Sequence, residues 1–394
     1  MAYLNSFSLV NGEIYAEERW IPHGFVRVNA GKIVSVGSMS EYDRAPYETV
    51  IEIPVRAKVV PGFIDVHLHG VAGSDFMDGT QLSLHTISEA LPEEGTTSFL
   101  ATTLSQSPAM IERAMVHIRQ WMTQSNFKGA QCLGLHLEGP FLHPQKAGAQ
   151  PVQWLTTPDL SLIRKWQKMA QGAIKIVTLA PELEGGMTLI RMLTQMGIKV
   201  SIGHSNATYQ EAMFALNCGA SHITHLYNQM SGLHHRDPGI VGAAFWHPNC
   251  TVELIVDGIH VCKEMVQLAY QQITSERLIC ITDAMRGKKQ APGMYDLAGQ
   301  QVQVKGKQAM LPDGTLAGSL LSMNEALRSL YQMTGCSLSD VIHTATRNPA
   351  QMLGIYGRKG SIKVGKDGDL VIMNENFDIL ATFIMGKEIY TKNQ

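Results

Sequence analysis

The chain has 394 residues, of which 45% are hydrophobic and 17% are charged, and its formal net charge is −2. This composition is typical of a folded protein with a large core, and the length predicts two or three domains. The small net charge gives no reason to expect nucleic acid or an anionic membrane as a partner.

The first 58 residues are predicted to form a small β unit. Turn pairs such as Asn11-Gly12 and Ala30-Gly31 separate short runs of β-forming residues and favour hairpins, and no helical periodicity occurs. We therefore expect strands at 6–9, 25–28, 33–36 and 49–53.

A different pattern begins after Pro61, where eight apolar, β-rich runs recur with helix-like stretches between them. In the stretch 107–122, Ser107 suits an N-cap, Pro108 suits the first turn, and apolar residues form one stripe at helical spacing. Repeated strand–helix alternation predicts a (β/α)8 barrel of the TIM type. The expected strands are 63–68, 97–101, 132–137, 174–179, 199–202, 223–226, 252–256 and 278–281.

Most of these runs end in side chains that can bind a metal or transfer a proton. His67 and His69 end the first run, and alternation along a strand places both on the same face. Two imidazoles about 6–7 Å apart can share a metal ion. Barrel enzymes carry their active sites at the C-terminal ends of the strands, so these ends together predict one site. The later ends contribute Glu138, His204, His225, His260 and Asp283.

Beyond the eighth run, residues 314–319 are predicted to form a loop, and 321–333 and 340–353 are predicted to form helices. Residues 359–394 return to strands at 360–365, 369–373 and 379–384. This tail matches the N-terminal region in style, so we expect both ends to fold together. The predicted domains are a β-sandwich from 1–58 and 357–394, and a barrel from 59–356.

The sequence resembles the amidohydrolase superfamily over the whole chain, and within it the branch that deacetylates amino-sugar phosphates. The motifs that carry the resemblance are P-G-F-I-D-V-H-L-H-G, H-L-E-G-P-F, G-H-S, T-H-L-Y-N-Q-M, V-D-G-I-H and T-D-A-M. H-L-E-G-P-F followed at a distance by T-H-L-Y-N is specific for this branch, whereas a lone H-x-H would be a weak signal.

The resemblance implies a metal centre with one or two divalent ions per subunit. Glu138, His204 and His225 would hold the principal ion, and His67 and His69 would add a second site that shares Glu138. Zinc or iron is expected, with manganese or cobalt as alternatives, because carboxylate and imidazole ligands suit all four.

The resemblance also implies that Asp283 is the catalytic acid/base, although a helix N-cap is an alternative role for this residue. Arg236 and His260 are the candidates for the phosphate, since Arg can bind phosphate bidentately. Alternatively, Arg236 forms an ion pair with Asp237, or it serves the neighbouring subunit of a homodimer. The residues implied at the sugar and its phosphate are Asn228, Gln229, Arg236 and His260, with Leu316, Ala317 and Gly318 in a loop over the substrate.

One position departs from the pattern of many relatives, which carry a histidine twelve residues after the metal-binding glutamate. Here that residue is Gln150. An amide can donate a hydrogen bond but cannot act as an acid. We therefore expect Gln150 to contact the substrate only.

The implied activity is the removal of the acetyl group from N-acetylglucosamine 6-phosphate, a small-molecule substrate. A bound divalent metal lowers the pKa of its water from 15.7 towards ~7, so that hydroxide serves as nucleophile, and Asp283 transfers the proton. The nearest alternative substrate is N-acetylgalactosamine 6-phosphate. A ring-opening amidohydrolase is disfavoured because residues 178–182 lack a bridging lysine. A non-catalytic scaffold is disfavoured because the expected ligands and Asp283 are all present.

The sequence contains no apolar stretch of about 18 residues, and its first twenty residues include three glutamates, so neither a transmembrane helix nor a signal peptide is predicted. The six cysteines form no C-x-x-C pair. We expect reduced thiols and a cytoplasmic location.

Overall fold

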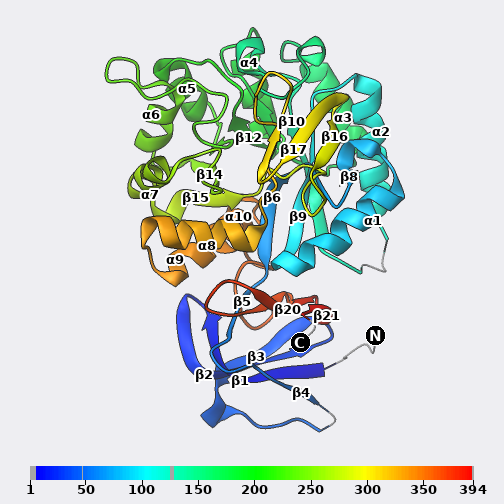
Figure 1. Cartoon of the computed structure of the whole chain (residues 1–394), viewed down its shortest axis with the longest axis vertical. Helices are drawn as coiled ribbons and strands as arrows, with labels where there is room; N and C mark the ends of the chain where they lie inside the picture. Colours follow the sequence, from blue (N-terminus) through cyan, green and yellow to red (C-terminus); the bar gives the residue numbers. More distant parts are fainter. Residues whose placement is uncertain (1–5, 47, 125–127, 393–394) are drawn as a thin grey trace.

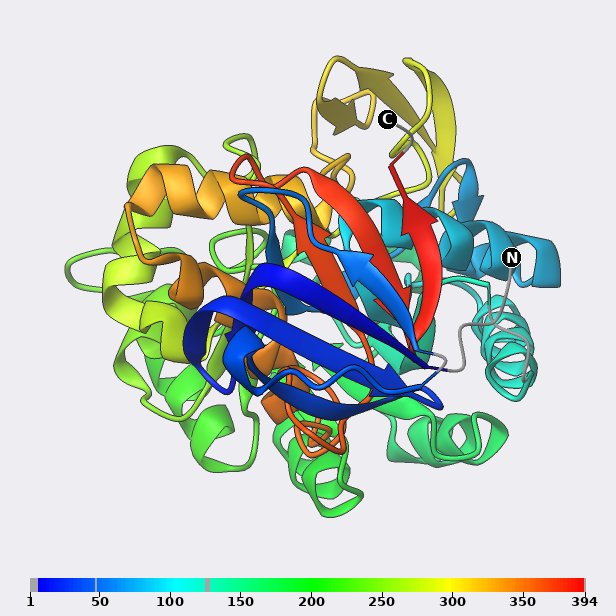
Figure 2. The ribbon, with the colours of Figure 1, turned by 90° about the horizontal axis from the view of Figure 1, so that it is seen from below.

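The β-forming residues at the two ends of the chain build one sheet. The structure is a computed structural model that describes residues 6–46, 48–124 and 128–392. The sheet has the strand order β21-β20-β19-β5-β1-β2-β3, with β4 paired to β1. Figure 2 shows its N-terminal strands in blue and its C-terminal strands in red, side by side beneath the rest of the molecule. The strands are β1 (Ser6–Ala16), β2 (Arg19–Asn29), β3 (Lys32–Ser38), β4 (Thr49–Glu52), β5 (Lys58–Pro61), β19 (Leu370–Met373), β20 (Ile379–Ile384) and β21 (Lys387–Thr391).

Antiparallel pairing of β5 with β19 joins the two ends of the chain, with Val60 opposite Val371. Phe7 and Phe383, which come from opposite ends of the sequence, stack with ring centroids 5.0 Å apart in the core of this sheet. The expected union of the two termini in a small β domain is therefore confirmed. The predicted boundaries at 58/59 and 356/357 stay a prediction.

The Asn11-Gly12 pair does not form the predicted hairpin turn but lies in an irregularity inside β1. A Cβ atom on Gly12 would lie 2.3 Å from Cδ1 of Ile53, so glycine is needed here for close packing. The first hairpin turns instead at Glu17 and Glu18, which have positive φ angles of 46° and 69°. The hairpin predicted at Ala30-Gly31 does form between β2 and β3.

The strand predicted at 360–365 was also wrong. Gly360 and Gly365 have φ angles of 84° and 90°, which bend the chain at both ends of the segment. Only Ile362 makes a β-bridge, to Ala16. The segment is consequently a loop that is held to β1 at one point.

All eight predicted apolar runs contribute strands to a parallel sheet in the order β15-β14-β13-β12-β11-β10-β9-β6. The sheet closes into a barrel where Asp283 N–H donates to the carbonyl of His67 and His69 N–H donates to that of Ala284, each at 2.8 Å. The predicted TIM-type barrel is thus confirmed. Its strands are β6 (Phe63–Leu68), β9 (Thr96–Thr103), β10 (Gln131–Glu138), β11 (Ile174–Leu179), β12 (Lys199–Ile202), β13 (His222–Ile223), β14 (Thr251–Ile255) and β15 (Leu278–Ile281).

Amphipathic helices cover the barrel (Figure 1). In the second helix, the Ser107 side chain accepts the N–H of Met110 at the N-terminus, while Ile111, Met115 and Ile118 are fully buried, as the sequence predicted. The helices are α1 (Gln81–Ala90), α2 (Pro108–Met122), α3 (Leu160–Met169), α4 (Gly186–Gln195), α5 (Tyr209–Asn217), α6 (Gly239–Trp246), α7 (Lys263–Arg277), α8 (Met323–Thr334), α9 (Leu338–Ala345) and α10 (Arg347–Met352).

Two small sheets were not predicted. One is a hairpin of β7 (Gly70–Val71) and β8 (Ser74–Asp75), and the other is an antiparallel sheet of β16 (Gly293–Leu297), β17 (Gln300–Lys305) and β18 (Gln308–Met310). In Figure 1, β16 and β17 lie at the end of the barrel away from the small domain. This insertion follows β15 and lies over the C-terminal ends of the barrel strands.

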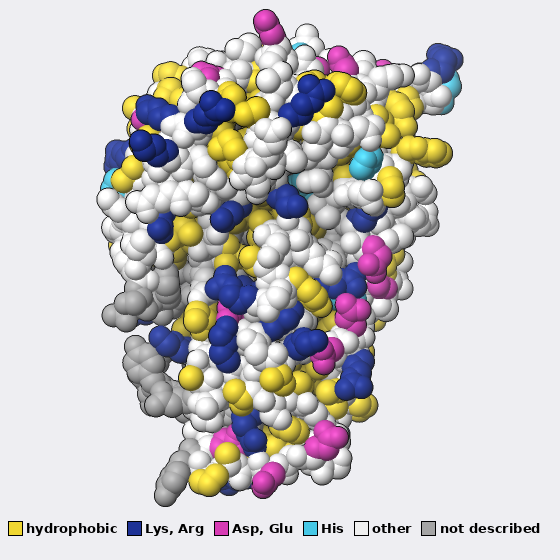
Figure 3. Space-filling model, turned by 180° about the vertical axis from the view of Figure 1, so that it is seen from behind, with side chains coloured by type: hydrophobic (Ala, Val, Ile, Leu, Met, Phe, Trp, Pro, Cys, Tyr) yellow, Lys and Arg dark blue, Asp and Glu magenta, His cyan; other side chains and the backbone are white. Residues whose placement is uncertain are grey.

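The surface carries both signs of charge. In Figure 3, which shows the back of the molecule, Lys and Arg side chains are spread from the top to the middle, Asp and Glu side chains lie mostly towards the edges, and hydrophobic side chains are scattered. In the part of the chain that the structure describes, no helix combines the length and the apolar character needed to cross a bilayer.

Candidate metal centre and catalytic site

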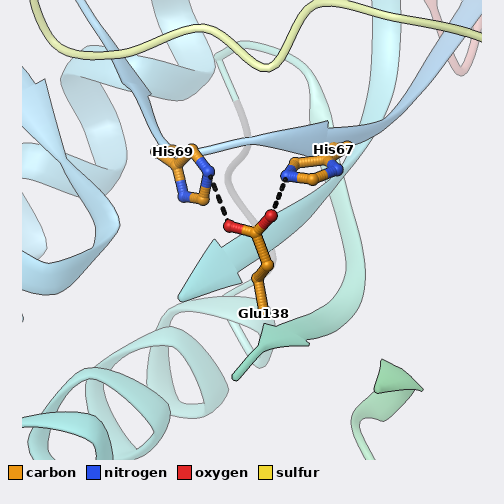
Figure 4. Close-up of side chains that lie close together, drawn as sticks. All are labelled: His67, His69 and Glu138. Carbon is orange, nitrogen blue, oxygen red and sulfur yellow. Dashed lines mark ion pairs between the residues drawn. The ribbon is translucent and has the colours of Figure 1, made fainter. Parts of the chain in front are cut away.

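Two histidines at the end of β6 face the last residue of β10. His67 Nε2 lies 3.4 Å from Glu138 Oε1, and His69 Nε2 lies 3.3 Å from Glu138 Oε2. Figure 4 shows the two rings pointing at opposite oxygens of the one carboxylate. All three residues are at least 98% buried. The alternation of side chains along the strand thus brings both imidazoles to the same carboxylate.

Two further histidines approach the same carboxylate from the next part of the barrel. His204, after β12, and His225, after β13, place their Nε2 atoms 3.0 and 3.1 Å from Glu138 Oε1. These two nitrogens are 3.0 Å apart. Glu138 therefore belongs to two groups with metal-binding spacing, one with His67 and His69 and one with His204 and His225.

The hydrogen bonds of these rings fit a cation at the centre. The Nδ1 atoms of His67, His69 and His204 each face an oxygen: Glu253 Oε2 at 2.9 Å, the Thr102 carbonyl at 3.3 Å and the Lys146 carbonyl at 2.8 Å. An Nδ1–H that donates outward leaves the Nε2 lone pair directed inward, as in metal-bound histidines. His67 Nε2 is moreover buried without a hydrogen-bond partner. Carboxylate and imidazole ligands at this spacing suit a divalent metal.

The backbone is unusual at the same place. His204, His225 and Asp283 have φ angles of 48°, 28° and 47°, in the left-handed region that favours glycine. Such residues cost about 1–3 kcal/mol each and cluster at functional sites. The strand ends are bent here so that these side chains turn into the barrel mouth.

Asp283, which follows β15, is a further acidic side chain that faces the candidate metal ligands. Its Oδ1 lies 3.2 Å from His69 Nε2 and 3.5 Å from His67 Nε2. Burial would raise the pKa of this carboxyl group, but the charge of His67 and the hydrogen bond from His69 hold the pKa below its usual value. The alternative role as a helix N-cap is wrong, because Ala284 enters a β-bridge with Ser319 instead of starting a helix. Asp283 is therefore an ionised carboxylate that faces the candidate metal ligands.

Asp65 lies two residues before His67 on the same face of β6, and its hydrogen bonds support the position of Asp283. Its buried carboxylate accepts the Thr282 hydroxyl at 2.6 Å and the His67 backbone N–H at 3.2 Å. Burial raises the pKa of Asp65 to about 6. The residue links β6 to β15 and thereby fixes the position of Asp283.

Metal uptake is expected to release protons. Without a cation, burial opposes protonation of His69, but hydrogen bonds to Asp283 and Glu138 raise its pKa to about 9, and the charge of Glu138 raises the pKa of His67 as well. Below pH 9 a cation must displace these protons, so apparent affinity should increase as the pH is raised towards 9. We expect metal binding to release about two protons per chain at neutral pH. Calorimetric titration with zinc in buffers of different ionisation enthalpy measures the number of protons released. Heats that do not depend on the buffer would contradict this expectation.

A cavity opens at this end of the barrel above the candidate metal ligands. Its wall contains Leu104, Ala149 and Leu297, apolar residues that the sequence analysis did not identify. Leu297 comes from the unpredicted strand β16, and no sequence signal places it there. Predicted residues that line the cavity are His69, Glu138, Gln150, His204, His225, Asn228, Gln229, His260, Asp283, Leu316 and Gly318.

Two predicted substrate residues are not in the cavity wall of this chain. Ala317 is fully buried, and its backbone N–H donates to the Ala309 carbonyl at 2.9 Å. Arg236 is exposed in the loop before α6, and its backbone N–H donates to His234 Nδ1. Among the described residues, no ion pair joins Arg236 to Asp237. The guanidinium is therefore neither in the cavity nor neutralised by its neighbour.

Gln150 lines the cavity, but the chain uses both ends of its amide. Its Oε1 accepts the N–H of Ser105, and its Nε2 donates to Glu138 Oε2, each at 2.7 Å. The Gln150 side chain thus connects the Ser105 backbone to Glu138 and orients the Glu138 carboxylate. A substrate contact through its second amide hydrogen stays a prediction.

His260 is the cationic candidate within the cavity wall. Its Nδ1 lies 2.7 Å from Asp257 Oδ2. Burial would lower the pKa of His260, but the hydrogen bond and the charge of Asp257 raise it. The ring therefore favours its protonated form, which suits an anionic group of a ligand.

Comparisons with known proteins agree with this geometry. The Amidohydrolase family profile matches residues 58–389. An N-acetylglucosamine-6-phosphate deacetylase of Bacillus subtilis is 46% identical over 375 residues, which are 95% of this chain and 94% of that protein. An N-acetylgalactosamine-6-phosphate deacetylase of Escherichia coli is 35% identical over 95% of this chain and 97% of its own length. A variant of the Mycobacterium smegmatis N-acetyl-D-glucosamine-6-phosphate deacetylase, solved in complex with N-acetyl-D-glucosamine-6-phosphate, has a TM-score of 0.91 and 28% identity, covering 98% of this chain and 100% of that one.

Proposed function

The chain belongs to the amidohydrolase family, and on this premise we propose that it hydrolyses the acetamido group of N-acetylglucosamine 6-phosphate to give glucosamine 6-phosphate and acetate. The observation that carries the proposal is the convergence of four histidine Nε2 atoms on Glu138 beside the ionised Asp283. The relatives of known activity support the choice of substrate.

The metal centre would use two groups of ligands. Glu138, His204 and His225 would hold one divalent ion, and His67 and His69 would hold a second one together with Glu138. We propose zinc or iron, with manganese and cobalt as alternatives. A divalent ion in this centre supplies Lewis acidity, which polarises a carbonyl group and lowers the pKa of water.

Asp283 moves the proton in the proposed reaction. Its carboxylate accepts a proton from the water whose oxygen bonds to the acetyl carbonyl carbon. When the carbon–nitrogen bond breaks, the same carboxyl group returns the proton to the sugar nitrogen, which leaves as an amine. The ionised state of Asp283 suits the first step. An acid/base positioned in this way contributes about 10²- to 10⁴-fold in rate.

The sugar and its phosphate would be bound at the cavity wall by Asn228, Gln229 and His260. Among the described residues of that wall, His260 is the only basic side chain apart from the candidate metal ligands. A phosphate dianion normally requires stronger cationic partners such as Arg. We therefore propose a homodimer in which the exposed Arg236 reaches the phosphate in the partner's cavity.

This arrangement predicts complementation between two inactive variants. Arg236→Ala and Asp283→Asn are each expected to be strongly impaired, whereas randomly mixed dimers should recover about a quarter of wild-type activity, because each heterodimer contains one site with both residues. The subunits can be mixed by co-expression and their activity compared with that of each variant alone. A monomer in size-exclusion chromatography, or mixed dimers without recovered activity, would contradict the trans arrangement.

The test of the function is acetate release from N-acetylglucosamine 6-phosphate by protein of known metal content. We expect release from this sugar, much less from unphosphorylated N-acetylglucosamine, and loss of activity with a chelator that zinc or iron restores. N-acetylgalactosamine 6-phosphate and a cyclic amide serve as comparison substrates. Equal or faster turnover of either, or no acetate from metal-loaded protein, would reject the proposal. A metal-loaded protein that only binds the sugar phosphate would instead be a scaffold.

We also propose a cytoplasmic location. The support is that all six cysteines are free thiols. Two of them, Cys250 and Cys280, are buried. Free thiols of this kind are typical of a reducing compartment.

A further inference from the structure

A second carboxylate lies beneath the metal centre and takes no part in the proposed reaction. Glu253, on β14, is fully buried. It accepts the Nδ1–H of His67 at 2.9 Å, the Nε2–H of His222 at 2.8 Å and the backbone N–H of His225 at 3.3 Å. Its side-chain partners are thus two histidines from different strands, one of which is a candidate metal ligand.

These hydrogen bonds determine which nitrogen of His67 is available. Because Glu253 Oε2 holds the Nδ1–H, Nε2 is the nitrogen that faces Glu138 and Asp283 and that can offer a lone pair to a cation there. A ring with its proton on Nε2 would present a hydrogen atom to the same space and could not bind a cation there. No other group among the described residues is bonded to His67 Nδ1.

The other oxygen of Glu253 is fixed as firmly. His222 Nε2 faces it, and His222 Nδ1 lies 2.7 Å from the hydroxyl of Thr251, which is itself 3.3 Å from the Ser221 carbonyl. The ring is held at both nitrogens, so Glu253 cannot rotate without losing a buried hydrogen bond. Losing such a bond to a charged group costs more than losing a neutral one.

Glu253 also lies at metal-binding distance from His67 and His136, but this group is a support and not a third metal site. Both nitrogens of His136 are engaged, with Nδ1 3.1 Å from the Val66 carbonyl and Nε2 2.7 Å from the Thr178 hydroxyl.

We propose that Glu253 is the positioning residue for the cation held by His67, His69 and Glu138, which it secures by fixing the Nδ1–H tautomer of His67. The inference rests on the proposed metal centre. It deepens that function by separating the two cation positions: the ring nitrogens of His204 and His225 are not bonded to Glu253, so the other position does not depend on its charge in the same way.

The variant Glu253→Gln tests this role. An amide can accept from one histidine, but its NH2 group would then face the N–H of the other, and His67 loses its charged acceptor in either orientation of the amide. Loss of such an outer partner typically weakens metal affinity about 10- to 100-fold. We expect metal-free protein titrated with zinc to bind two ions in the wild type and, at the same concentrations, one in Glu253→Gln.

The matched control is Glu94→Gln, the same change at another buried glutamate, whose carboxylate is 2.9 Å from Lys288 Nζ. We expect this variant to have a lower Tm yet to bind two zinc ions, which separates a positioning role from a merely structural one. A Glu253→Gln protein that keeps two tight zinc sites, a wild type with one site, or a Glu94→Gln variant with the same deficit would overturn the proposal.

A measurement on the wild-type protein tests the proposal even if the Glu253→Gln variant does not fold. In zinc-loaded protein with 15N-labelled histidine, the His67 signal, assigned by its loss in His67→Asn, is expected to carry its proton on Nδ1. A proton on Nε2 would overturn the proposal. Zinc stoichiometry and the tautomer require no substrate, so they can fail while acetate release succeeds, and the reverse also holds.

Discussion

Replacing Asp283 with asparagine is expected to lower kcat by about 10²- to 10⁴-fold. The amide cannot accept the proton of the attacking water or return it to the leaving nitrogen, while its size and backbone are nearly unchanged. Asp283 is bonded to the barrel through its backbone N–H and carbonyl, to His67 and Ser319, so the fold should persist. Steady-state acetate release at saturating substrate measures the effect.

The matched control is Asp340→Asn, the same chemical change on α9, where the carboxylate accepts hydrogen bonds from Ser275 and Ser337. This variant should keep the wild-type kcat, with at most a lower Tm. Zinc or iron content should be equal in both variants and the wild type. An Asp283→Asn protein that keeps more than about a tenth of the wild-type kcat would remove Asp283 from the acid/base role.

Replacing Glu138 with glutamine is expected to abolish metal binding at both positions and activity with it. Among the described residues, its carboxylate is the only group shared by the two sets of candidate ligands, and it faces four imidazoles. In the metal-free protein the charge of Glu138 is stabilised against burial by His67 and His204, which lower its pKa. An amide provides one weak ligand oxygen and an NH2 group that repels cations. Affinity should fall more than the 10- to 100-fold typical of outer-shell partners.

Metal analysis after gel filtration checks this expectation, with His69→Gln as the comparison. His69 belongs to one ligand set only, so that variant should keep the ion at His204 and His225. Two ions in Glu138→Gln would show that the carboxylate does not bridge. A thermal scan with and without added zinc gives an independent reading, because an ion that binds the folded state alone raises Tm.

The barrel could be predicted because its strands are continuous apolar runs and each helix carries its own periodicity, as in 107–122. The candidate site could be predicted for a related reason: parallel strands bring their C-terminal ends to one rim, so His67, Glu138 and Asp283 meet although they are far apart in the sequence. The resemblance supplied the roles of these residues, and the structure brings their side chains together.

The errors have a common physical cause, which is that a local pattern does not reveal a distant partner. Gly12 was read as a turn residue, but its lack of a side chain makes room for Ile53. The sheet containing β16 left no signal in the sequence analysis, although it contributes Leu297 to the cavity. Glu253 was overlooked, yet a glutamate in the buried run 252–256 is a signal in itself, because a carboxylate without a partner is costly to bury.

The left-handed backbone at His204, His225 and Asp283 has a consequence for how the protein responds to selection. Glycine, and to a lesser degree asparagine, would adopt these φ angles with less backbone strain. The residues that would make the folded state most stable at these positions are therefore not the residues that the proposed chemistry requires. Variants selected for heat resistance alone would therefore tend to lose these side chains first. Thermostability in this protein is better improved in the small domain, around β5 and β19, whose residues take no part in the proposed chemistry.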